Sequence, residues 1–235
     1  MFEWLKGLKR RSPKFELPSR DERAARNQES TDLGRFAPEP REFLGQLAYL
    51  ELSAFEIMTS QIKFAPTTAA KAQLSEAAAK SFDKYRSLSR SLAALGFDPT
   101  DAMEPFTERL DMFHSRTTGL DWYETVLKLY LSLGMLEEFY RKLAAGLPNA
   151  IEADVAKALS DKTIEKFAKK VLVEAMQKDA TLGSRLALWG RRLMGDVLLQ
   201  LRAAVPTASL EEIEPVIAEL NGPHSLRMDA IGLAA

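Results

Sequence analysis

The sequence predicts an all-α protein built as a bundle of long helices. Apolar residues recur at intervals of three and four residues over long stretches, which is the period of a helix with one buried face. One stretch, residues 121–145, is apolar on nearly all of its faces, as expected for a helix at the centre of a bundle. No segment alternates apolar and polar residues as a half-buried strand does, and no fixed-period repeat is present.

The composition is that of a folded protein without a strong charge bias. The 235 residues, 46% hydrophobic and 28% charged, suffice for one large domain or two small ones with a sizeable core. Lys and Arg number 32 and Asp and Glu number 33, so the chain as a whole has no electrostatic preference for nucleic acid. The absence of cysteine excludes disulfides, thiolate metal sites and a cysteine nucleophile. No apolar run approaches the roughly 18 residues of a membrane span, and no signal-peptide core is present, so we expect a cytoplasmic protein.

Residues 1–39 are predicted to form a basic amphipathic arm followed by a polar linker. The opening residues 1–11, MFEWLKGLKRR, interleave four large apolar residues with four cationic ones. Such an arm contacts an anionic membrane or RNA, or it docks on its own bundle or on a partner subunit, and the sequence leaves these alternatives open. Three prolines and many charges in residues 12–38 are typical of a linker.

The bundle is expected over residues 40–205, and its first helix carries an inward carboxylate. This helix begins near the start of that range and is ended by Pro66. Glu51 lies on its apolar stripe, four residues after Leu47 and three before Ala54. The helical period therefore turns the Glu51 carboxylate toward the core.

The second helix, expected from residue 69 to Gly96, places two polar side chains near the same core. Ser81 occupies the apolar stripe and points inward, and Lys84 lies beside it, one turn further along. The remaining helices are expected over residues 102–113, 121–145, 151–177, 182–205 and 210–220. The apolar end of residues 206–235 predicts that this segment packs back on the bundle.

The third long helix, residues 121–145, has few acidic residues. Glu124 is its main acidic exception before the polar pair Glu137 and Glu138. In the fifth helix, Arg191 and Arg192 follow Trp189 closely. This group could stack on an RNA base, but it is also typical of a solvated helix face beside a core tryptophan.

Four segments of the chain resemble one protein family. They are AYLELSAFE (48–56), SFDKYRSLSRSLAALGFDPTDAMEPF (81–106), WYETVLKLY (122–130) and RLALWGRRLMGDVLLQ (185–200). The chain from residue 40 to residue 235 is similar to actinobacterial ferritin-like proteins related to tRNA 2-methylthio-isopentenyladenosine hydroxylase. The resemblance implies a ferritin-like four-helix bundle with additional C-terminal helices and makes a homodimer plausible.

The resemblance also implies positions for a di-iron site, and three of them, Ser81, Lys84 and Ile164, have lost their ligand. The family pattern places the first carboxylate at Glu51. It places a Glu-x-x-His pair at Ser81 and Lys84, and an acidic-x-x-His pair at Asp161 and Ile164. The carboxylate of the third helix falls either on Glu124 or on the position of Leu133. The pattern therefore implies a degenerate metal site in this chain.

The rest of the sequence offers few replacements for the missing ligands. Two irons in a bundle need about six carboxylate and imidazole ligands, and the chain has only His114 and His224. Neither histidine follows an inward carboxylate by three residues. Lys84 is a poor ligand while charged, but it is a good counter-ion for Glu51 or Asp161. The alternatives are that Lys84 reaches solvent along the edge of its stripe, or that an unconventional metal site exists.

Three functions are consistent with these observations. The first is a non-catalytic ferritin-like protein with a structural or interaction role and no cofactor, in which Lys84 pairs with Glu51 or Asp161. The second is an enzyme, a non-haem di-iron hydroxylase acting on a modified nucleoside or another hydrophobic group. It would require iron held by oxygen ligands such as Glu51, Glu56, Glu124 and Asp161. The third is an adaptor that contacts RNA or a membrane through residues 1–11.

Overall fold

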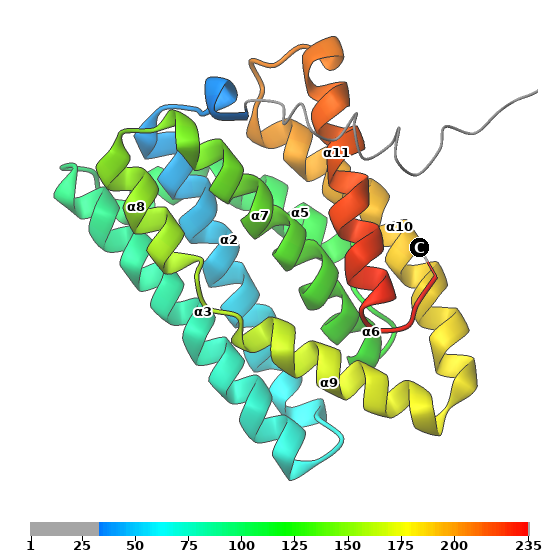
Figure 1. Cartoon of the computed structure of the whole chain (residues 1–235). Coiled ribbons are helices and arrows are strands. Elements are labelled where there is room, and N and C mark those ends of the chain that lie inside the picture. The colour runs from blue at the N-terminus through cyan, green and yellow to red at the C-terminus, as the bar shows by residue number, and fades with distance from the viewer. Residues whose placement is uncertain (1–32, 235) are drawn as a thin grey trace, which may run out of the picture. The chain divides into compact units, whose positions relative to one another are not determined.

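The computed structural model describes residues 33–234, and every regular element in this range is a helix or helical turn (Figure 1). The prediction of an all-α fold is therefore confirmed. The predicted arm, residues 1–11, and most of the linker lie outside the described residues. Leu33–Phe36, expected as the end of the linker, instead form a short 3₁₀-helix, η2, whose Leu33 and Phe36 side chains are buried in the core.

Two long helices, α2 (Pro40–Gln61) and α3 (Thr68–Ala94), lie side by side as an antiparallel pair (Figure 1). Pro40 stands in the first turn of α2, where its missing N–H costs nothing. A 3₁₀ turn, η3 (Ile62–Phe64), ends this helix before the connection. Thr67 caps α3 because its side chain accepts a hydrogen bond of 3.0 Å from the Ala70 N–H.

The predicted third helix is central, but it is interrupted. It consists of α6 (Trp122–Lys128), a π-helical segment η5 (Leu129–Leu133) and α7 (Gly134–Leu143), and most of its side chains are buried. A π-helical turn contains one residue more than an α-helical turn. Residues after Leu133 are therefore displaced by one position from the faces that an uninterrupted α-helix would give them.

Before this central helix, α4 (Pro99–Met103), η4 (Glu104–Phe106) and α5 (Thr107–Arg116) pack along α2. The contact between α2 and α4 is close at Gly45. A Cβ atom there would lie 2.1 Å from the Ala102 carbonyl oxygen, so only glycine permits this approach.

The predicted fourth helix is divided in two. The turn η6 (Ala144–Gly146) leads into α8 (Asn149–Ala158), and four residues separate the end of α8 from the start of α9 (Thr163–Lys178). The physical reason lies in Asp161, whose carboxylate accepts a hydrogen bond of 2.9 Å from the Thr163 N–H. This local bond offers the backbone an alternative to a continuous helix.

Two further helices complete the described chain. They are α10 (Ala180–Ala204) and α11 (Leu210–Asp229), which contact each other (Figure 1). α11 is longer than the expected 210–220 and continues through Pro215 and Pro223. The segment ends with Met228, Ile231 and Leu233 buried in the core. Within residues 33–234, none of the helices combines the length and apolar character needed to cross a membrane.

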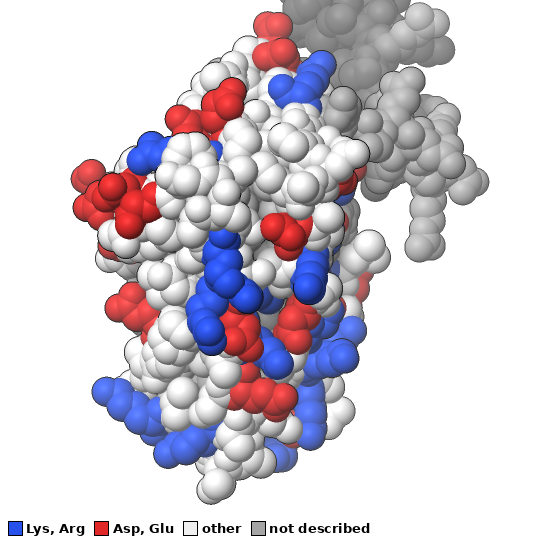
Figure 2. Space-filling view, turned by 90° about the vertical axis from the view of Figure 1, so that its left-hand side faces the viewer, with Lys and Arg blue, Asp and Glu red and all other residues white. Residues whose placement is uncertain are grey.

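The surface carries charges of both signs. Figure 2 shows Lys and Arg side chains interspersed with Asp and Glu on one face of the molecule. Among the described residues on this face, cationic side chains form no continuous band of the kind that follows a nucleic-acid backbone.

Candidate functional site

Four polar side chains meet in the core of the bundle. Glu51 comes from α2, Ser81 and Lys84 come from α3, and Glu137 comes from α7. Their exposed fractions are 0%, 1%, 4% and 3%, respectively. Ser81 and Lys84 share one face of α3 because they are three residues apart. We refer to these four residues as the core cluster.

Lys84 is the centre of the core cluster. Its Nζ donates a hydrogen bond of 2.5 Å to Oε1 of Glu137 and lies 3.9 Å from Oε2 of Glu51. Ser81 donates from its hydroxyl to the same Oε2 of Glu51, at 3.0 Å. The other carboxyl oxygen of Glu51 is buried and has no hydrogen-bond partner among the described residues. Lys84 is thus the direct counter-ion of Glu137, and Glu51 stands at a longer distance.

The two carboxyl groups of the core cluster differ in their electrostatic environment. Burial raises the pKa of Glu51 to about 8; Lys84 opposes this shift, and Glu137 adds to it. Burial lowers the pKa of Lys84, but Glu51 and Glu137 together raise it by more, so the net direction is upward. At neutral pH Glu51 is therefore mostly protonated and Lys84 is charged. One ammonium then balances the Glu137 carboxylate, and the core cluster is neutral.

The two predicted positions on the fourth helix lie beside the core cluster. Both carboxylate oxygens of Asp161 accept hydrogen bonds from Thr163, at 2.9 Å from its N–H and 3.2 Å from its hydroxyl. Asp161 raises the pKa of Lys84 from a distance but forms no ion pair with it. Ile164, Asp161 and Glu137 line a cavity of about 10 Å³, which has room for about one water molecule. Of the two partners expected for Lys84, Glu51 lies within ion-pairing distance and Asp161 does not, and the nearest carboxylate is that of Glu137.

Glu124 lies elsewhere in the bundle. Its side chain accepts hydrogen bonds of 2.8 Å from the Leu120 N–H and 2.9 Å from Nη1 of Arg185. Arg185 also pairs with Asp121, so the group ties the start of α6 to α10. The Glu124 side chain is buried. Its ion pair with Arg185 joins α6 to α10 and does not involve the core cluster.

Glu137 is the one member of the core cluster that the sequence pattern did not predict. It is the carboxylate that the third helix contributes, whereas Glu124 and the position of Leu133 were the two candidates. A signal for it exists, because Glu137 follows Leu133 by four residues and precedes Tyr140 by three. The same spacing singled out Glu51. Because Glu138 follows it directly, Glu137 looks like part of a polar pair that ends an apolar stretch.

Both histidines lie in helices, where His114 is half-buried and His224 is buried. His114 lies on α5, and neither of its ring nitrogens has a partner among the described residues. Burial lowers the pKa of His114 to about 3, and a nearby Lys128 acts in the same direction. His224 lies on α11, and burial lowers its pKa as well. Neither histidine forms a hydrogen bond with a member of the core cluster in the described structure.

The core cluster does not fit a pair of irons. Two irons need about six carboxylate and imidazole ligands, which also neutralise the charge of the metal. Here one of the two carboxyl groups is bound by an ammonium, and no imidazole is near. Glu56 is exposed on the surface of α2, so the oxygen-only set of Glu51, Glu56, Glu124 and Asp161 is not assembled. Within residues 33–234, no three His, Asp or Glu side chains gather in an arrangement that could hold a metal ion.

A family model described as a ferritin-like domain of actinomycetes matches residues 35–213 of this chain. The matched region contains all four residues of the core cluster. A search of curated proteins found no match.

Proposed function

The chain belongs to the ferritin-like domain family of actinomycetes, and we propose that it is a non-catalytic member whose Lys84–Glu137 pair takes the place of a di-iron centre. The observation that carries this proposal is the 2.5 Å hydrogen bond from Lys84 to Glu137 in a fully enclosed core. The proposed role is structural or in protein interaction. A second copy of the chain is the partner that the resemblance implies.

The position of each residue supports the proposal. Ferritin-like di-iron proteins take one Glu from each of two helices and a Glu-x-x-His pair from each of the other two. Glu51 on α2 and Glu137 on α7 correspond to the two single carboxylates. Ser81 and Lys84 stand where one Glu-x-x-His pair is expected. The pair that would come from the fourth helix is Asp161 followed, three residues later, by a buried isoleucine.

The chemistry of lysine explains how the substitution stabilises such a core. A buried carboxylate without a partner is costly, and a metal or an ammonium can offset that cost. An ammonium has no lone pair, so it supplies charge without coordination chemistry. In this arrangement Lys84 holds α3 against α7 through Glu137 and leaves no open position for oxygen or substrate. The rival function, a di-iron hydroxylase, requires ligands at the positions that Ser81, Lys84 and Ile164 occupy.

Restoring the missing ligands tests the proposal. We expect the triple variant Ser81→Glu, Lys84→His, Ile164→His to bind iron, because it recreates Glu-x-x-His on α3 and acidic-x-x-His at the start of α9. Each protein is mixed with ferrous iron without oxygen and desalted, and the retained iron is measured by mass spectrometry. The matched control adds Glu137→Gln to the triple variant and is expected to retain less iron. A folded triple variant that retains no more iron than the parent chain would count against the assignment of these positions.

A further inference from the structure

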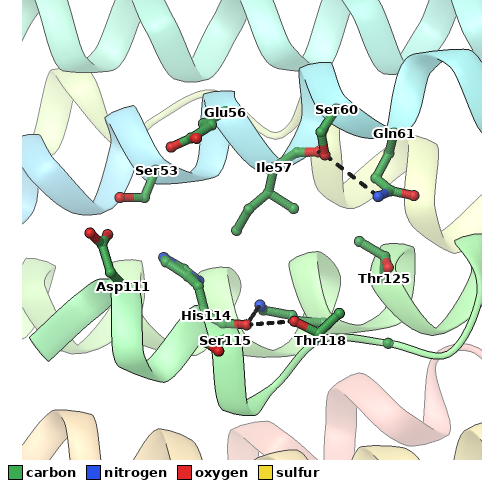
Figure 3. Close-up of a pocket in the computed structure, with 12 residues that line it drawn as sticks. Ser53, Glu56, Ile57, Ser60, Gln61, Asp111, His114, Ser115, Thr118 and Thr125 are labelled. Carbon is green, nitrogen blue, oxygen red and sulfur yellow. Dashed lines mark hydrogen bonds between the residues drawn. The ribbon is translucent and has the colours of Figure 1, made fainter. Parts of the chain in front are cut away.

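A polar pocket of about 370 Å³ lies between α2, α5 and α6 (Figure 3). Figure 3 shows Ser53, Glu56 and Ile57 from α2 facing Asp111 and His114 from α5, with the His114 ring directed into the space between the helices. This volume falls in the lower part of the range typical of small-molecule sites. None of the core-cluster residues lines it.

Lys128 supplies a buried cation to this pocket. Its side chain lines the pocket, and the residue is only 4% exposed. Its Nζ donates a hydrogen bond of 3.1 Å to the backbone carbonyl of His114. In the described part of the chain, no carboxylate oxygen lies within 4 Å of this ammonium. Lys84, the other buried lysine discussed above, has two carboxyl groups within that distance.

A buried ammonium without a counter-ion is costly. Burial accordingly lowers the pKa of Lys128 to about 8, with no opposing contribution from a carboxylate. Lys128 is nevertheless mostly charged at pH 7, and two of its three N–H donors are left for a further acceptor. The contact that would relieve this cost is a negatively charged oxygen in the pocket.

Neutral hydrogen-bonding groups surround the cation. The ring nitrogens of His114 are buried and unpartnered in the described structure, so a neutral imidazole offers one donor and one acceptor. Five hydroxyl side chains also line the pocket: Ser53, Ser60, Ser115, Thr118 and Thr125. This combination suits a ligand with several hydroxyl groups.

The charges around the pocket select among anions. One ammonium balances one negative charge, and the carboxylates of Glu56 and Asp111 line the same pocket. Asp111 is already the acceptor of a 2.7 Å hydrogen bond from the Tyr49 hydroxyl. Two carboxylates repel a second negative charge on the ligand, which disfavours a phosphate dianion.

We propose that the pocket beside Lys128 binds a small hydroxylated monocarboxylate, with its carboxylate on the Lys128 ammonium and its hydroxyl groups on the surrounding side chains. The site is independent of the core cluster and of the function proposed for it. With its carboxylate on Lys128, such a ligand would extend toward Glu56 and Asp111. These two carboxylates would then accept hydrogen bonds from its neutral hydroxyl groups.

D-gluconate is a suitable probe, and its binding to the full chain is measured by titration calorimetry at pH 7. We expect saturable binding by the wild type. Lys128→Met is expected to weaken it at least tenfold, whereas Lys71→Met, which removes an exposed lysine of α3, leaves it unchanged. D-glucose and phosphate at equal concentration are expected to bind at least tenfold more weakly. Absence of gluconate binding, equal binding of D-glucose, or stronger binding of phosphate would each overturn the proposal.

The pH dependence of the wild type gives a test that needs no variant. Anion binding requires the charged form of Lys128, whose pKa is about 8, so the affinity should fall as pH rises above that value. Between pH 7 and pH 9.5 we expect a loss on the order of thirtyfold. The other titratable groups that line the pocket are His114, whose pKa is about 3, and the carboxylates Glu56 and Asp111. Tyr49, which donates a hydrogen bond to Asp111 from outside the lining, has a pKa of about 12. A constant affinity over this range would contradict a role for Lys128.

Discussion

Replacing Lys84 with alanine is expected to lower the free energy of unfolding by about 3–5 kcal/mol at pH 7. The Lys84 ammonium is the only cation within 4 Å of either core carboxyl group in the described structure. Its removal leaves Glu137, which is 3% exposed, as a buried carboxylate without a counter-ion. Urea denaturation followed by circular dichroism measures the effect.

Two controls separate loss of charge pairing from loss of packing. Lys71→Ala removes an exposed lysine from the same helix and should change stability by no more than about 0.5 kcal/mol. The double variant Lys84→Met, Glu137→Gln removes both charges at similar volume, and should recover most of the loss seen in Lys84→Met alone. If Lys84→Ala were as mild as Lys71→Ala, or if the double variant were no better than Lys84→Met, the buried pair would not be what holds this core.

Replacing Glu51 with glutamine is expected to stabilise the protein by about 3 kcal/mol at pH 7. The pKa of Glu51 is about 8 in the folded chain, against 4.5 as the ordinary value. Below pH 4.5 the group is protonated in both states and imposes no cost. Between pH 4.5 and 8 only the unfolded chain releases the proton, so the wild type loses stability as pH rises. Glutamine cannot ionise, and its amide oxygen can still accept the 3.0 Å hydrogen bond from Ser81.

The pH profile distinguishes this effect from a general change in packing. Denaturation midpoints of Glu51→Gln and the wild type should converge toward pH 4.5 and diverge steadily up to pH 8. The matched variant Glu137→Gln removes the partner of Lys84 and should instead destabilise the protein at neutral pH. A difference between Glu51→Gln and the wild type that stays the same from pH 5 to pH 8 would show that Glu51 is not protonated in the folded chain.

The helices and three of the four core-cluster residues could be predicted from the sequence because they depend on local periodicity, with Lys84 one turn from Ser81 on the same helix. Glu51 and Ser81 lie on apolar stripes of uninterrupted α-helices, so spacing alone placed them in the core. The sequence also marked Glu124 as an acidic residue in an otherwise apolar helix. Its partner Arg185 stands 61 residues away, and no local pattern reveals a contact of that kind.

The remaining features depend on contacts between helices, or on local hydrogen bonds that compete with the helical periodicity. The π-helical segment shifts Glu137 by one position relative to a regular helix. The hydrogen bond between Lys84 and Glu137 forms because α3 and α7 pack together, which local periodicity does not reveal. The break before α9 comes from the local hydrogen bond of Asp161, which competes with a periodicity that favours one long helix. His114 lies in a polar stretch of sequence, and only the packing of α5 on α2 encloses its ring.

The iron content of the wild-type protein tests the replacement of the metal by Lys84. The full chain is purified from cells grown with ample iron, without chelators, and metal per chain is determined by mass spectrometry. The triple variant Ser81→Glu, Lys84→His, Ile164→His, prepared identically, serves as the positive control. Because Lys84 already pairs with Glu137 in the core cluster, we expect the wild type to contain almost no iron. A content of about two irons per wild-type chain would contradict this replacement and favour the di-iron hydroxylase.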